Sequence, residues 1–202
     1  MKKSGFTLAE TTIAMIILGL IAATLLHTLK PNNMKREFMD KSAKNMVIQI
    51  EYATKQILAR NTLNYSLLDI VAVDNTTFSI ASSGQESKLA ALYKKYLIGL
   101  RKSSIPASYT SSSLTDEAGT SSGYTISSFA NGFKLKNGAY MAFKLNGNCT
   151  TSETKIYNPT LPQKRTETNS CGLVFYDINS EAPPNNLGVD QFILSIGKYG
   201  IK

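Results

Sequence analysis

The feature that most constrains this chain is a long apolar run close to its N-terminus. From Phe6 to Leu29 the sequence has 24 residues, and Glu10 is the only carboxylate among them. As a helix, this run would be about 36 Å long at roughly 1.5 Å per residue, more than the about 30 Å of a bilayer's hydrocarbon core. An ionised Glu inside such a segment costs roughly 2.5 to 3.5 kcal/mol, so it calls for a partner. The run therefore predicts a transmembrane helix whose single acid is neutralised by another group.

A free amine could be that partner. If the chain were cut after Gly5, Phe6 would carry a positive terminal amine at the edge of the run, and Glu10 of a neighbouring copy could neutralise it. Lys2 and Lys3 precede the run, so the positive-inside bias places the N-terminus in the cytoplasm and the body of the protein on the other side.

A family resemblance supports this interpretation. Lys2-Lys3-Ser4-Gly5 followed by Phe6-Thr7-Leu8-Ala9-Glu10 resembles the leader and mature start of type IV pilins and type II secretion pseudopilins. The resemblance implies that a prepilin peptidase cuts between Gly5 and Phe6 and methylates the new amine, and that Phe6 and Glu10 direct assembly. It covers the N-terminal stretch closely and the rest loosely. His27 departs from it, close to where many members have a helix-bending Pro, although Pro31 is nearby.

The resemblance also implies a fold, a location and a function. The fold class would be α+β, a type IV pilin-like fold in which a long N-terminal helix, its first half transmembrane, packs on a C-terminal antiparallel β-sheet head. The expected domains are a leader at 1–5, a transmembrane and polymerisation helix at 6–30 and a soluble pilin head at 31–202. The protein would be a single-pass inner-membrane protein before assembly and part of an extracellular or periplasmic filament afterwards.

The expected function is that of a structural subunit in a type IV pilus-like filament that serves adhesion, motility, DNA uptake or secretion. Its partners would be itself and other pilin subunits, the prepilin peptidase, inner-membrane lipid and a pilus or secretion assembly platform. Two alternatives remain open: a type II secretion pseudopilin, or, from another class, a secreted or membrane-anchored binding domain with no filament role.

Two other interpretations of the N-terminus compete with the pilin-like one. A secretory signal peptide has a basic start, an apolar stretch of roughly 7 to 15 residues and a small-residue cleavage site. The segment from Ile13 to Leu26, with Ala22-Ala23, fits that description, and a plain signal anchor is the other possibility. Neither needs Glu10 in the apolar run just after a Gly-Phe junction, so the pilin-like interpretation is favoured.

The rest of the sequence predicts two helices followed by strands. Apolar residues recur at spacings of three or four from Met34 to Leu58, which indicates an amphipathic helix over about 33–60. A second apolar stripe, from Leu89 to Tyr96, indicates a helix over about 86–97. Over about 124–200, short alternating runs with Asn131-Gly132 and Asn137-Gly138 between them predict hairpins of an antiparallel β-sheet.

Charge and cysteine content limit which ligands and covalent bonds the chain is expected to form. The net charge of +8 comes from scattered basic residues, so DNA binding is possible but not indicated. Cys149 and Cys171 form an even count, which in an oxidising compartment favours one disulfide. The single His27 lies in the apolar run, so a thiol metal site or a Cys-His nucleophile has no histidine elsewhere to use. Closure of this region by a disulfide is similar to the C-terminal region of many pilins.

One cluster of oxygen ligands stands near the C-terminus. Asp177, Asn179 and Asp190 are candidate calcium ligands, since calcium takes roughly six to eight oxygens and a related loop binds calcium in the major pseudopilins. Ser180 stands where a Gly is often found, and a polar turn held by Asx hydrogen bonds is the alternative. Calcium is therefore a possible cofactor. Without a phosphate-binding Gly loop or a His outside the apolar run, we expect no enzymatic activity.

Overall fold

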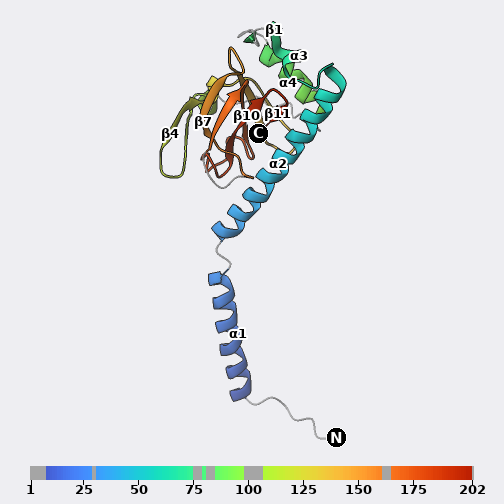
Figure 1. Ribbon diagram of the computed structural model, residues 1–202. Coiled ribbons are helices and arrows are strands. Elements are labelled where there is room, and N and C mark those ends of the chain that lie inside the picture. Colours follow the sequence, from blue (N-terminus) through green and yellow to red (C-terminus); the bar gives the residue numbers. More distant parts are fainter. Residues whose placement is uncertain are drawn as a thin grey trace. The chain divides into compact units, whose positions relative to one another are not determined.

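The computed structural model describes residues 8–28, 31–74, 79–80, 85–97, 107–160 and 165–201. The chain divides into two compact units, Met1–Phe38 and Met39–Lys202. Figure 1 labels several of the elements.

The N-terminal part of the chain contains two separate helices. Helix α1 spans Leu8–Thr28, and helix α2 spans Pro31–Asn61. Pro31 has no backbone N–H, so it cannot donate a helical hydrogen bond to an earlier carbonyl, whereas its fixed φ suits the first turn of a new helix. Helix α2 also differs in chemistry, because charged residues such as Lys35, Arg36 and Lys41 interrupt its apolar positions.

The expected fold class and location are therefore wrong. One long N-terminal helix with a transmembrane first half was predicted, but the structure has two helices, and among the described residues none is both long and apolar enough to cross a membrane. The single-pass inner-membrane location is contradicted by the same finding. The missing backbone N–H of Pro31 predicts a kink or short break near residues 30–33, and α2 does begin at Pro31; the error was to treat the helices on either side as two halves of one long helix.

The centre of the fold is a five-stranded antiparallel sheet with the order β11-β10-β9-β6-β5. Its strands are β5 (Ala130–Lys134), β6 (Tyr140–Leu145), β9 (Gly172–Asp177), β10 (Gln191–Gly197) and β11 (Gly200–Ile201). Every residue of β9 and β10 is buried, because both faces of the sheet are covered. These two strands accordingly read as nearly continuous apolar runs in the sequence.

Three two-stranded ribbons and several short helices complete the described structure. The ribbons pair β1 (Ala72–Asp74) with β2 (Ser79–Ile80), β3 (Ser113–Thr115) with β4 (Ser121–Thr125), and β7 (Thr151–Ile156) with β8 (Arg165–Ser170). The helices are α3 (Leu68–Val71), α4 (Gln85–Tyr96), α5 (Ala107–Thr110) and the 3-10 turn η1 (Ile126–Ser128).

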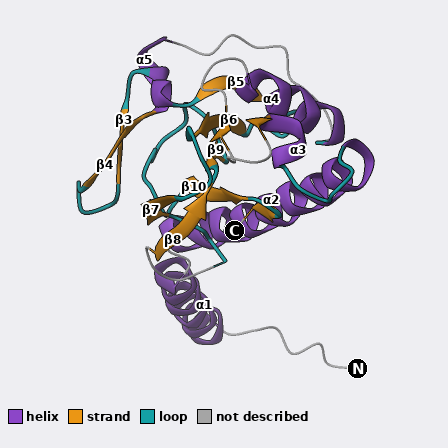
Figure 2. Cartoon of the chain, turned by 45° about the horizontal axis from the view of Figure 1, so that its top comes forward, coloured by secondary structure: helices purple, strands orange, loops and turns teal. Residues whose placement is uncertain are grey.

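The two faces of the sheet carry two separate apolar cores. Helices α2, α3 and α4 cover one face, where Val174 and Tyr176 of β9 belong to the same buried apolar cluster as Ile50 of α2 and Tyr93 of α4. The other face, which includes Leu173 and Phe175, packs against residues of β3, η1 and β7. Successive residues of β9 thus point to opposite cores, as the period of two in a strand requires. Figure 2 shows α3 and α4 on one side of the sheet and the β3–β4 ribbon on the other.

A buried polar contact fixes α4 against α2. The Thr54 hydroxyl donates to the Ile50 carbonyl at 2.7 Å, and it lies 2.6 Å from the Tyr93 hydroxyl. Because Thr54 uses its own proton on Ile50, the Tyr93 hydroxyl is the donor between the two side chains. The Tyr93 ring lies 5.2 Å from the Phe143 ring, so this helix pair is also packed directly on β6.

One of the two Asn-Gly pairs does not form the predicted turn. Asn137-Gly138 does connect β5 to β6, where Leu135 N–H donates to Ala139 O at 2.8 Å. In contrast, Asn131-Gly132 lies inside β5, at a register shift between Ala130 and Phe133, with Asn131 at φ 55°. The left-handed conformation that Asn tolerates is therefore used for a bulge in the strand instead of a hairpin.

Candidate functional site

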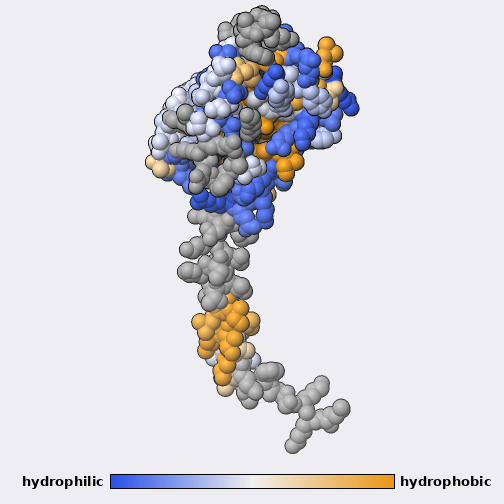
Figure 3. Space-filling view, viewed as in Figure 1, coloured by the Kyte–Doolittle hydropathy of each residue, from blue (hydrophilic) through white to orange (hydrophobic). Residues whose placement is uncertain are grey.

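Helix α1 presents apolar side chains all around its axis. Its described large hydrophobic residues are between 50 % and 86 % exposed, and they are Leu8, Ile13, Met15, Ile16, Ile17, Leu18, Leu20 and Ile21. Figure 3 shows a hydrophobic patch on the visible face of this segment. A helix that is apolar on every side is normally buried. Helix α1 is therefore a candidate surface for association.

The two threonine hydroxyls near the start of α1 are satisfied within the helix. Thr11 and Thr12 donate to the Leu8 carbonyl at 2.9 Å and 2.7 Å, respectively. A hydroxyl that is already hydrogen-bonded costs less to remove from water than a free one. These residues therefore do not prevent α1 from being covered by an apolar partner.

The predicted processing and assembly residues lie at or before the start of the described part of the chain. Glu10 lies in the first turn of α1, and its side chain is outside the described part of the chain. Gly5 and Phe6 also lie outside the described residues. The predicted pairing of Phe6 with Glu10 of another copy thus stays a prediction.

The predicted disulfide is confirmed. Cys149 and Cys171 are bonded with an S–S distance of 2.01 Å and a sequence separation of 22 residues. Both sulfur-bearing residues belong to the core on the helical face of the sheet, with Cys171 almost fully buried. The bond joins the segment before β7 to the start of β9, so it holds the β7–β8 ribbon to the central sheet.

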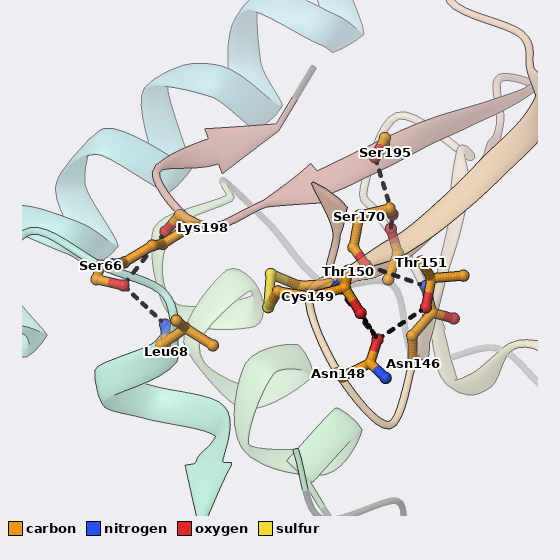
Figure 4. The surroundings of a disulfide bond; sticks show 12 residues. Ser66, Leu68, Asn146, Asn148, Cys149, Thr150, Thr151, Ser170, Ser195 and Lys198 are labelled. Atoms are coloured by element: carbon orange, nitrogen blue, oxygen red, sulfur yellow. Dashed lines mark hydrogen bonds between the residues drawn. A yellow bond between two sulfur atoms is a disulfide. The ribbon is translucent and has the colours of Figure 1, made fainter. Parts of the chain in front are cut away.

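Hydrogen bonds reinforce the surroundings of the disulfide (Figure 4). Asn148 Oδ1 accepts from the backbone N–H and the hydroxyl of Thr150 at 3.1 Å and 2.9 Å. On the other side of the bridge, the hydroxyl of Ser195 donates to Ser170 Oγ at 2.9 Å, and Ser170 donates to the Gly172 carbonyl at 2.8 Å. The polar groups around the bridge are therefore paired within the fold.

Asp177 and Asp190, here named the acidic clamp, close the loop between β9 and β10. Both carboxylates are fully buried. Asp177 Oδ2 accepts from the Tyr109 hydroxyl at 2.7 Å and from Gln191 Nε2 at 3.0 Å, and its Oδ1 accepts from Asn179 N–H at 3.0 Å. The structure thus brings a residue of α5 to the end of β9.

Asp190 holds the other end of the same loop. Its two oxygens accept from the backbone N–H groups of Asn185 and Asn186 at 2.9 Å and 2.8 Å. Ser180, where the resemblance favours Gly, adopts φ 59°, so the tight turn is made without glycine. Lys134 of β5 binds both oxygens of Glu181 at 2.6 Å, which ties the loop to the edge of the sheet.

Burial controls the ionisation of the acidic clamp. Loss of solvent raises the pKa of Asp177 to about 7; the hydrogen bond from Tyr109 opposes this rise and the charge of Asp190 adds to it. Burial also raises the pKa of Asp190, against the lowering effect of the N–H groups of Asn185 and Asn186. Burial and the Asp177 charge hold the pKa of the Tyr109 hydroxyl far above its usual range, so Tyr109 remains a donor.

The predicted calcium ligands do come together, but their oxygens are largely used within the protein. Asp177, Asn179 and Asp190 lie in one cluster, since Asn179 hydrogen-bonds to Asp177 and influences Asp190. In the described part of the chain, Asn179 Oδ1, Ser180 Oγ and Gln191 Oε1 are buried oxygens in and beside this cluster that have no hydrogen-bond partner. No group of three or more His, Cys, Asp or Glu among the described residues could hold a metal ion. The donor set fits a loop held by Asx hydrogen bonds better than a site with six oxygens.

Sequence reasoning missed Tyr109 and Gln191 as partners of Asp177. Gln191 is adjacent to Asp190 at the start of a predicted strand, so its inward direction could have been inferred from strand alternation. Tyr109 is 68 residues from Asp177, in a Ser- and Thr-rich segment that carries no periodic signal. Only the tertiary fold reveals that contact.

Two surface grooves lie on the unit Met39–Lys202. The first, named the disulfide groove, has a volume of about 480 Å³ and is lined by residues that include Leu68, Cys149, Lys198 and Tyr199. The second, named the tyrosine groove, has a volume of about 640 Å³ and is lined by residues that include Ile48, Tyr52, Tyr96, Leu135 and Lys136. Both are mainly apolar with a lysine on the wall, which is a common composition for a binding surface.

Comparisons with known proteins give no relative. No family model, no curated protein and no solved structure matches this chain.

Proposed function

We propose that this chain is a structural subunit of a type IV pilus-like filament that associates with other copies through α1. The observation that carries the proposal is the exposed apolar surface of α1 on all sides of the helix. Removing apolar surface from water stabilises an assembly by roughly 25 cal/mol per Å². Neighbouring α1 helices are suitable partners because each presents the same apolar surface.

The sequence before α1 supplies the proposed register between copies. Cleavage after Gly5 would give Phe6 a positive amine, and Glu10 of the next copy would neutralise it. The Gly5-Phe6 junction and Glu10 are the residues that resemble the pilin and pseudopilin start. A type II secretion pseudopilus would use the same contact, so the proposal covers both kinds of filament. In this proposal, the protein acts by assembling into a filament and not by catalysis.

The experiment compares Glu10→Ala with Glu10→Gln and with wild type in cells that export the chain. Filament yield is measured by electron microscopy, and the mature N-terminus is determined by mass spectrometry. We expect a mature chain that starts at Phe6 in all three, with filaments lost in the Ala variant. Asp40→Asn, a change to an exposed acid of the unit Met39–Lys202 that has no part in the proposed contacts, controls for the loss of one carboxylate. Wild-type filament yield from Glu10→Ala would refute the proposed contact.

A secreted binding domain with no filament role is the second candidate. The unit Met39–Lys202 favours it, since this unit has its own two cores, a disulfide and two grooves. Where the two candidates differ, these findings favour the binding domain. That function does not require one long N-terminal helix, and the structure has two separate helices instead. A mature chain that starts after Ala22 or Ala23 and forms no filament would establish this second candidate over the first.

A further inference from the structure

We propose that the tyrosine groove of one copy receives the acidic β3–β4 hairpin tip of a second copy. This inference rests on the proposed filament function and identifies a second contact in it, separate from α1. The hairpin tip consists of Asp116, Glu117, Ala118 and Gly119, between β3 and β4. Both surfaces belong to the unit Met39–Lys202.

The groove offers apolar surface that a partner would cover. Ile48 and Tyr52 of α2 are 60 % and 63 % exposed, and they lie one helical turn apart on the same side of α2. Tyr96 of α4 and Leu135, just after β5, form other parts of the wall. Tyrosine combines a large apolar ring with a polar hydroxyl, which suits it to a contact that is partly wet.

The groove is bordered mainly by positive charge. Lys136 lines it, and the exposed Lys95 places its ammonium 5.6 Å from the centre of the Tyr96 ring. Lys55 follows Tyr52 by three residues on α2, while Glu51 is the acid next to them. An occupant with carboxylates therefore complements this surface better than a basic one.

The hairpin tip provides carboxylates on a preformed turn. Asp116 Oδ1 accepts from the backbone N–H groups of Ala118 and Thr120 at 3.1 Å and 2.8 Å, and Gly119 adopts the left-handed φ of 77°. Residues 117–120 are exposed. Because the turn is already ordered, little conformational entropy would be lost when it binds.

The two surfaces lie on opposite sides of the unit. Figures 1 and 2 both show the β3–β4 ribbon on the far side of the central sheet from α2 and α4. A hairpin therefore cannot fill the groove of its own chain, and a contact between copies joins different patches. Such a head-to-tail contact either closes a ring or continues as an open filament.

Charge alone does not account for the contact. Exposed ion pairs contribute little and are screened by salt. The apolar wall of Ile48 and Tyr52 must supply most of the stabilisation, while Glu117 and Lys136 set the orientation of the two copies. We therefore expect the contact to weaken as salt is raised without disappearing.

The test is zero-length cross-linking of the purified full chain with a carbodiimide, which joins a carboxylate directly to an amine. Detergent is present to cover α1, and equal amounts of 15N-labelled and unlabelled chain are mixed. Mass spectrometry should find Glu117 or Asp116 joined to Lys136 or Lys95 with one light and one heavy peptide. The yield should fall several-fold in Glu117→Gln and in Lys136→Gln. Lys88→Gln, an exposed lysine at the other end of α4, is the matched control and should not change it.

Charge reversal separates the contact from a general loss of charge. Glu117→Lys alone and Lys136→Glu alone should each lose the cross-link, and an equal mixture of the two variants should recover it. Cross-links from the groove lysines to other acids, or a cross-link unaffected by Glu117→Gln, would overturn the proposal.

The outcomes also separate this inference from the proposed function. If the wild-type chain gives no cross-link, and Glu117→Gln and Lys136→Gln still form filaments at the wild-type yield, the groove contact is overturned and α1 assembly stands. The cross-link in a chain that forms no filaments would support the groove contact and count against α1 assembly.

Discussion

The Tyr109 hydroxyl donates a 2.7 Å hydrogen bond to Asp177 Oδ2 across 68 residues of chain. Tyr109 belongs to α5, and Asp177 ends β9 at the centre of the sheet. Tyr109 is itself buried, and its ring lies edge-on to that of Tyr140, 5.7 Å away. This one bond therefore connects the segment before β3 to the loop that the acidic clamp closes.

Tyr109→Phe should destabilise the fold while keeping the ring in place. Losing the donor leaves a buried carboxylate oxygen with one partner fewer, which costs about 1–3 kcal/mol of unfolding free energy. Chemical denaturation monitored by circular dichroism would measure this loss. Tyr199→Phe, at an exposed tyrosine, is the control and should change stability by less than about 0.5 kcal/mol. Equal midpoints for the two variants would contradict the role of the Tyr109 hydroxyl.

Stability should fall as pH rises through neutrality. The pKa of Asp177 is raised to about 7 in the folded state by burial, so the folded state binds a proton more tightly than the unfolded state. The resulting stabilisation is complete below the ordinary pKa of Asp and is lost as pH approaches and passes about 7. Denaturation midpoints between pH 4 and 8 would measure the slope.

Asp177→Asn should flatten that slope, because the side chain no longer titrates. Glu181 affects stability in a different pH range. The hydrogen bond from Lys134 lowers the pKa of Glu181 to about 2, so the stability that this ion pair contributes is lost only in strong acid. Glu117→Gln, an exposed carboxylate, is the control. The same slope in Asp177→Asn and wild type would show that Asp177 does not cause it.

Removal of the disulfide should destabilise the chain by about 3 kcal/mol, since Cys149–Cys171 closes a loop of 22 residues in the unfolded state. The measurement is the unfolding free energy of wild type and of the double variant Cys149→Ala/Cys171→Ala. Reductant should lower the stability of wild type and leave the double variant unchanged. A wild type that is unaffected by complete reduction would contradict this prediction.

Gly172→Ala should be severely destabilising. Gly172 pairs with Leu145 in the sheet, and an added Cβ would collide with the backbone carbonyl oxygen of Lys144. Overpacking of this kind costs roughly 1–3 kcal/mol or more, because a backbone atom cannot rotate away. Gly147→Ala is the matched control, since nothing lies within 4 Å of its added Cβ. Thermal melts of both variants would test the difference, and similar melting temperatures would refute it.

Calcium should have little effect on thermal stability. The oxygens of Asp177 and Asp190 already accept hydrogen bonds from Tyr109, Asn185 and Asn186. We expect the melting temperature of the purified chain to be the same in excess calcium and in chelator. A higher melting temperature in calcium that Asp190→Asn abolishes would instead establish the metal site at the acidic clamp.

Local sequence patterns predicted the central strands and a break near Pro31, but they also led to the wrong expectation of one long N-terminal helix. The apolar runs that end at Asp177 and begin at Gln191 coincide with β9 and β10, because strands buried on both faces need apolar residues at nearly every position. Pro31 predicted a break, but the apolar run before it and the periodic apolar stripe after it were interpreted as two halves of one helix. Backbone hydrogen bonding, and not side-chain hydropathy, decides where a helix begins.

The candidate site was only partly predictable. The count of two cysteines was sufficient to predict the bond between Cys149 and Cys171, since a single pairing exists. The cluster of Asp177, Asn179 and Asp190 was also visible as a group of oxygens, whereas its hydrogen-bond donors were not. Tyr109 lies next to Asp177 only because of the tertiary fold. Asn131-Gly132 shows that the same kind of dipeptide can form a turn or a bulge, depending on the strands around it.

The complete burial of β9 and β10 limits how this protein can diversify. Neither strand has a position whose side chain faces only solvent, so substitutions that leave the interior intact are confined to the ribbons, the loops and the outer faces of the helices. A chain built in this way can alter what it touches while its interior stays nearly fixed.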